Sequence, residues 1–72
     1  MSHVEQILEL DRLLARERMI LQQLQIHYDG LAPGTSAATH ASSRIAEAVG
    51  FVRSLEAKKY ALIRLAGMPV LH

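Results

Sequence analysis

The sequence contains no cysteine, so neither a disulfide framework nor a cysteine-based zinc site can stabilise it. It also has no long apolar run: its apolar stretches extend over only a few residues, whereas a membrane-spanning helix needs roughly 18 to 20. The opening MSHVEQ lacks the basic and apolar regions of a secretory signal. We therefore expect a cytoplasmic protein with no membrane insertion.

The sequence also lacks an excess of charge of one sign. Its net charge is +1, and Lys and Arg are interspersed with Asp and Glu rather than clustered. Nucleic-acid binding normally requires a basic patch, because the affinity comes largely from phosphate contacts. We expect no nucleic-acid partner.

The chain has little length with which to build a core. Its 72 residues form at most one small domain, and half of them are hydrophobic, which is not a disordered composition. In chains of this size, conformational entropy of about 1.5 kcal/mol per residue nearly cancels the gain from burial. Oligomerisation or a partner is the expected source of further stability.

Glycine and proline are absent from Val4 to Tyr28, where good helix formers dominate. Ser2 and Glu5 have the spacing of a capping box, which predicts that a helix begins at once. Gly30 can adopt the left-handed conformation of a helix C-cap. The pattern predicts a first helix over about 3–29.

Pro33 and Gly34 predict a turn over 30–35, with Thr35 or Ser36 as the next helix cap. A second helix is expected over about 37–66, where the helical pattern is strongest from residue 44, followed by a tail over 67–72. The small and polar segment 35–43 is either the first part of this helix or a flexible connection. The predicted fold is an all-α antiparallel two-helix hairpin with coiled-coil packing, assembling into a helical bundle by oligomerisation. A closed hairpin and one that swaps a helix with a neighbour are both compatible with the sequence.

The first helix carries two apolar seams. At about 100° per residue, the main seam alternates steps of three and four, as in a heptad repeat, and Leu13 and Ile20 broaden it. The residues of this main seam are Ile7, Leu10, Leu14, Glu17, Leu21, Leu24, Tyr28 and Leu31. The second seam lies on the opposite side, is interrupted by Arg12 and Gln22, and consists of Leu8, Ala15, Met19 and Ile26.

The second helix has apolar residues over roughly 220° of its circumference, which exceeds what one neighbouring helix covers. A surplus apolar surface of this kind favours a symmetric dimer or a client helix laid in a groove. The residues predicted to line a partner or oligomer interface are Leu8, Ala15, Met19, Ile26, Phe51, Leu55, Leu62 and Leu65.

Three charged residues fall in or near these seams. Glu17 occupies a core position of the heptad, and Arg53 lies at about the same level on the second helix. These residues either form an ion pair that sets the register, or Glu17 lies at the margin of the seam and reaches water. Lys59 is expected to cover apolar surface with its stem while its ammonium group reaches solvent.

Candidate chemistry is sparse. His3, His27, His40 and His72 include no pair at helical ligand spacing, although the turn brings His27 towards His40. The carboxylates do not converge in a pattern suited to acid–base work. We expect no metal, no cofactor and no enzymatic activity.

The segments LDRLLARERMILQQLQIHYDGL at 10–31 and RIAEAVGFVRSLEAKKYALIRLAG at 44–67 resemble helices of FlgN-type flagellar export chaperones. The shared features are a leucine-rich start leading into Arg-Glu-Arg, and a later Leu-Glu step with an Ala-rich end. The resemblance implies a cytosolic chaperone that holds hook-filament junction proteins through their terminal helical segments. This chain departs from the family in its short length and in its small, polar connection at 35–43.

The sequence therefore favours a protein-interaction module, an export chaperone that self-associates, preferably as a dimer, and shields a helical client. The alternative is a purely structural bundle subunit whose seams are all consumed by self-association. A small enzyme with a site between subunits is a third, weaker interpretation.

Overall fold

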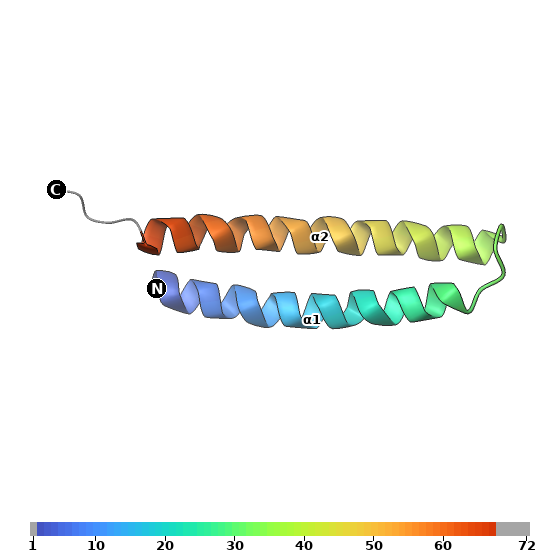
Figure 1. The fold of residues 1–72 in the computed structure, drawn as a ribbon, viewed down its shortest axis with the longest axis horizontal. Coiled ribbons are helices and arrows are strands. Elements are labelled where there is room, and N and C mark those ends of the chain that lie inside the picture. Colours follow the sequence, from blue (N-terminus) through green and yellow to red (C-terminus); the bar gives the residue numbers. More distant parts are fainter. Residues whose placement is uncertain (1, 68–72) are drawn as a thin grey trace.

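The computed structural model describes residues 2–67, and over this range the chain is a hairpin of two long α-helices (Figure 1). Helix α1 spans His3–Asp29 and helix α2 spans Ser36–Gly67. The two helices of one chain run antiparallel and contact each other, which confirms the predicted all-α hairpin and shows it in its closed form. The predicted tail beyond Gly67, with His72, lies outside the described range.

Helix α1 begins where the capping pattern places it. The Ser2 hydroxyl oxygen accepts a hydrogen bond from the Glu5 amide at 3.2 Å. This bond satisfies one of the amide groups that have no partner in the first helical turn. Glu5 also places a negative charge at the positive end of the helix dipole.

The turn uses its glycines differently from the prediction. Gly30 has φ −84° and ψ −4°, so it is right-handed and the predicted left-handed C-cap at this residue is wrong. The left-handed residue is Gly34, with φ 78°. The chain therefore leaves α1 through a right-handed turn, with the Leu31 amide donating to the Tyr28 carbonyl at 3.0 Å, and reverses at Gly34.

Thr35 caps α2. Its hydroxyl oxygen accepts from the Ala38 amide at 3.1 Å, and the same hydroxyl donates to the Ala32 carbonyl at 2.8 Å. One side chain thus joins the turn to the helix start. The segment from Ser36 onward is helical, which decides the alternative that the sequence left open for 35–43.

The core is a thin line between the helices. Leu14 is 1% exposed and clusters with buried Val52 and Leu55, and Leu10 packs against them. The main seam of α1 faces α2, and all its members except Tyr28 are buried or half-buried. The facing line of α2 also alternates steps of three and four, and consists of Ala38, Ala41, Ile45, Ala48, Val52, Leu55, Lys59 and Leu62. Two matching heptad lines explain why the helices stay in contact along their length.

The small residues at the start of α2 have a packing role that the sequence prediction missed. Ala38 and Ala41 are buried, although the segment reads as having little to bury. Their spacing continues the heptad line of α2 towards the turn, and small side chains let two backbones approach closely. The heptad spacing was the signal that could have identified them.

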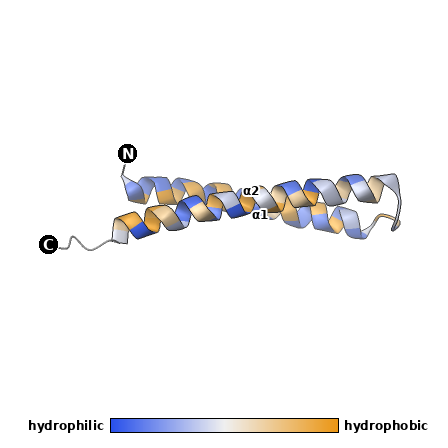
Figure 2. Cartoon of the chain, turned by 90° about the horizontal axis from the view of Figure 1, so that it is seen from above, coloured by the Kyte–Doolittle hydropathy of each residue, from blue (hydrophilic) through white to orange (hydrophobic). Residues whose placement is uncertain are grey.

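Polar and apolar residues alternate along both helices (Figure 2). Neither α1 nor α2, within residues 2–67, is both long enough and apolar enough to cross a membrane.

Candidate interaction surfaces

The outward side of α1 carries an exposed apolar line, which we call the outer stripe and define as Leu8, Ala15, Met19 and Ile26. Met19 is 62% exposed and Ile26 is 65% exposed, and Leu8 and Ala15 are exposed as well. These residues lie on the side of α1 opposite its main seam, so α2 cannot reach them. Val4 has the same orientation and is also exposed, which extends the stripe by one turn beyond the sequence prediction.

The α2 residues that were predicted to line an interface differ in their exposure. Phe51 and Leu65 are exposed, and Leu62 is half-buried. Leu55 is instead 4% exposed and belongs to the core between the helices. Leu55 is therefore removed from the candidate surface, because it lies on the heptad line that faces α1.

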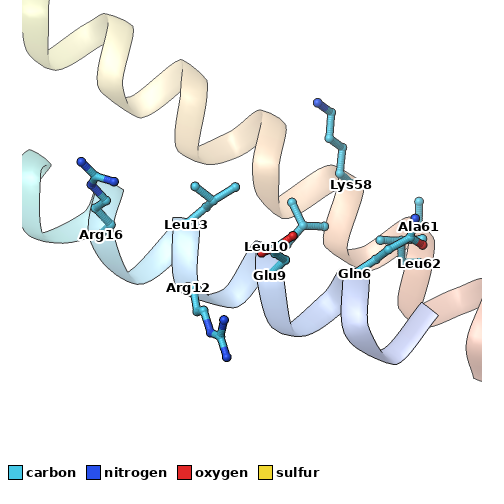
Figure 3. A pocket seen from close by; sticks show the side chains of 9 residues that line it. All are labelled: Gln6, Glu9, Leu10, Arg12, Leu13, Arg16, Lys58, Ala61 and Leu62. Atoms are coloured by element: carbon cyan, nitrogen blue, oxygen red, sulfur yellow. The ribbon is translucent and has the colours of Figure 1, made fainter. Parts of the chain in front are cut away.

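A groove runs between the helices near the open end of the hairpin. It has a volume of about 740 Å³ and is lined by apolar Leu10, Leu13 and Leu62, with the cations of Arg12, Arg16 and Lys58 near it and Glu9 as its carboxylate. Figure 3 shows Leu10 and Leu13 between the two helices, while Arg12 and Lys58 point away in opposite directions.

A second, smaller groove continues on the same side towards the turn. It is lined by Leu24 from α1 and by Ala48 and Phe51 from α2, with Arg44 and Glu47 at its edge. Helical periodicity places Leu13, Ile20 and Leu24 on one flank of α1, and Phe51, Lys58 and Leu62 on the facing flank of α2.

This whole side of the hairpin, which we call the groove face, carries exposed Leu13, Ile20 and Phe51 and half-buried Leu62. The sequence prediction treated Leu13 and Ile20 as a broadening of the main seam. Both are instead exposed, because they lie about 60–80° away from the centre of that seam.

The opposite side of the hairpin is held by charges. The Arg18 guanidinium donates to the Glu56 carboxylate at 2.9 Å, and the Lys59 ammonium pairs with Asp11. Lys59 thus ends at a carboxylate of α1 rather than free in solvent, which corrects the prediction for this residue. The two long sides of the hairpin differ in kind, since one is ion-paired and the other is apolar.

Of the two alternatives that the sequence left open for Glu17, the ion pair with Arg53 is not formed. Glu17 is half-buried and Arg53 is exposed, and no ion pair joins these two residues. They share a level along the hairpin but occupy different sides. Glu17 lies towards the groove face, whereas Arg53 lies on the ion-paired side. The level of a residue along the hairpin can be inferred by counting residues from the turn. The side of the hairpin on which its side chain lies depends on the rotation of each helix about its axis.

In comparisons with known proteins, the chain matches no family model, no curated protein and no solved structure. The two apolar surfaces of the hairpin are therefore the features from which a function can be inferred.

The histidines and carboxylates do not gather into a site within residues 2–67. No group of three or more His, Cys, Asp or Glu side chains in this range is placed to hold a metal ion. Nor does any buried side-chain nitrogen or oxygen in the described part of the chain lack a hydrogen-bond partner. His72 falls outside that part.

Proposed function

We propose that this chain is a non-enzymatic protein-interaction module that buries its outer stripe against a helical segment of a client protein. The single observation that carries the proposal is the exposure of Leu8, Met19 and Ile26 on a side of α1 that α2 cannot cover. An exposed row of large apolar side chains along one side of a helix is a surface that a partner helix can cover.

The mechanism is apolar burial along a helix. Leu8, Ala15, Met19 and Ile26 are separated by seven, four and seven residues, which is the spacing at which a second helix contacts the first along its length. Full burial of each large side chain is worth about 1.5–3 kcal/mol before the costs of association. Met19 at the centre is unbranched and repacks readily around side chains of different shape.

The narrower form of the proposal follows from the resemblance to FlgN-type chaperones. In that form the chain is a cytoplasmic export chaperone, and the client segment is a terminal helix of a hook-filament junction protein. The Arg-Glu-Arg stretch of the resemblance, at residues 16–18, is followed directly by Met19 of the outer stripe.

A second candidate function is a structural subunit that only self-associates. The groove face favours it, because exposed Leu13, Ile20 and Phe51 form a further apolar surface separate from the outer stripe. If both surfaces are covered by copies of the same chain, no surface remains for a client.

A charge placed on the outer stripe distinguishes these functions. Met19→Glu and Ile26→Lys are expected to leave the hairpin helical, but to weaken any complex that buries the stripe by at least tenfold, because an unpaired charge in an apolar interface costs several kcal/mol. Binding is measured by calorimetry with C-terminal helical segments of hook-filament junction proteins as probes, and self-association by light scattering.

Ala57→Glu is the matched control, because Ala57 is exposed on the side of α2 that faces away from α1. Loss of probe binding in Met19→Glu but not in Ala57→Glu supports the client function. A fall in molar mass in Met19→Glu supports the structural subunit instead. If Met19→Glu changes neither binding nor mass, the outer stripe has no function and the proposal is wrong.

A further inference from the structure

We propose that the groove face is covered by a second copy of this chain, packed antiparallel about a two-fold axis so that two hairpins form a four-helix bundle. In this dimer α1 lies on α1 of the partner copy, and α2 lies on α2. The inference goes beyond the proposed function, because it concerns the groove face and leaves the outer stripe free.

The first observation is the symmetry of α1. Its two exposed apolar residues on the groove face, Leu13 and Ile20, are equally distant from the point between Arg16 and Glu17. A two-fold axis through that point sets Leu13 of one copy against Ile20 of the other, and the reverse contact follows from symmetry.

The second observation is the symmetry of α2. Glu47 and Lys58, which line the two grooves, are equally distant from the point between Val52 and Arg53. An axis through that point sets Lys58 of each copy against Glu47 of the partner. Phe51, the large exposed aromatic residue between them, then lies next to Phe51 of the partner copy.

The two points of symmetry lie at the same level of the hairpin, within about one helical turn. Leu14 clusters with Val52 and Leu55, and Lys59 pairs with Asp11 one turn further along. Because α1 and α2 are antiparallel, these contacts place the middle of α1 beside the middle of α2. One axis therefore satisfies both helices, although their sequences are unrelated.

Charge is complementary across α2 in the antiparallel pair, because that pair sets Lys58 of each copy against Glu47 of the partner.

The area is also sufficient. The hairpin is 17 Å wide, and α1, with its 27 residues, is about 40 Å long. The footprint is their product, on the order of 700 Å² per copy, close to the roughly 800 Å² per partner of a standard stable interface.

The register of the proposed dimer is tested by exchanging the charges of Lys58 and Glu47. Molar mass is measured by light scattering over a dilution series for the wild-type chain, K58E, E47K and the double variant K58E/E47K. Each single variant is expected to weaken the dimer by roughly three- to tenfold, since it creates two symmetric like-charge contacts. The double variant restores the wild-type dissociation constant. R53E is the matched control, because it reverses an equal charge on the ion-paired side and leaves the dimer unchanged.

Disulfide crosslinking tests whether the groove face is the dimer interface, since the native chain has no cysteine. Ser54 is exposed, close to the proposed axis and on the groove face, so S54C is expected to form a covalent dimer under mild oxidation. I26C lies on the outer stripe at a position that is 65% exposed, and it is expected to remain uncrosslinked at the same protein concentration.

A wild-type chain that is monomeric at every concentration overturns the inference. So does a dimer in which I26C crosslinks and S54C does not, or one in which the double charge variant is no stronger than the single variants. These outcomes are independent of the client function, which depends on Met19→Glu and on probe binding.

Discussion

At the scale of single residues, burial in this hairpin is concentrated in a few side chains. Leu14 is the most deeply buried large side chain in residues 2–67, at 1% exposed, and its neighbours Val52 and Leu55 complete the central cluster. Most other seam residues are half-buried, because two helices alone leave each seam open at both edges. The stability of the monomer therefore depends unusually strongly on this one contact.

We expect Leu14→Ala to lower the free energy of unfolding by about 3 kcal/mol, since it removes buried methyl groups and leaves a cavity. The measurement is urea denaturation followed by circular dichroism at a fixed protein concentration. Ile26→Ala is the control, and because Ile26 is largely exposed the change should stay within about 0.5 kcal/mol. Equal losses in the two variants would contradict the assignment of the core.

The charged residues show what a linear sequence leaves open at this scale. Glu17 and Lys59 each interrupt the apolar heptad line of their helix, and both were identified as exceptions from the sequence. The structure pairs Lys59 with Asp11 and leaves Glu17 half-buried. Which carboxylate meets which cation depends on the side of each helix, and that is a property of the packed pair.

At the scale of elements, the helices follow from local rules and the turn does not. The absence of glycine and proline, the Ser2 cap and the Thr35 cap mark the observed starts of α1 and α2. The prediction for Gly30 was wrong because either glycine of the turn could have supplied the left-handed residue. The chain reversal uses Gly34, where the direction of the chain must change towards α2.

The two turn glycines should respond differently to alanine. Gly34→Ala forces a side chain into a left-handed conformation and is expected to cost about 1–2 kcal/mol. Gly30→Ala should be nearly neutral, because its φ is right-handed and the added Cβ meets the His27 carbonyl oxygen at an ordinary 3.6 Å. Thermal denaturation of the two variants checks this. A larger loss at Gly30 would place the left-handed residue there after all.

Gly50 offers a gain in stability within α2. It lies in the middle of the helix, and a Cβ added there meets nothing within 4 Å. Gly50→Ala should therefore raise the free energy of unfolding by about 0.5–1 kcal/mol, because alanine loses less backbone entropy in a helix. A rise in the denaturation midpoint without a change in molar mass is the expected result. A fall would mean that another chain approaches this backbone closely.

At the scale of the whole molecule, the hairpin is a scaffold with one ion-paired side and two apolar surfaces. The outer stripe and the groove face point in different directions, so a client and a second copy need not compete for one surface. The division allows self-association and client binding to be altered separately, through Lys58 and Met19 respectively.

The turn should tolerate extra length if it only connects the helices. Inserting Gly-Ser-Gly-Ser between Leu31 and Ala32 keeps the Thr35 contacts to Ala32 and Ala38 intact. Each doubling of loop length costs only about 0.6 kcal/mol, so helicity should persist and stability should fall slightly. Loss of the folded hairpin, seen by circular dichroism, would show that the turn itself belongs to an interface.

The sequence by itself determined the two helices, their caps and the seam of α1, because these depend on interactions within a few residues or on the heptad spacing. It also indicated that more apolar surface is present than two helices can cover. Only the tertiary structure decided that Leu55 is core, that Leu13 and Ile20 are exposed, and that Glu17 and Arg53 lie on different sides. The physical reason is that each of these depends on how far each helix is rotated about its own axis, and the packing of α1 against α2 sets that rotation.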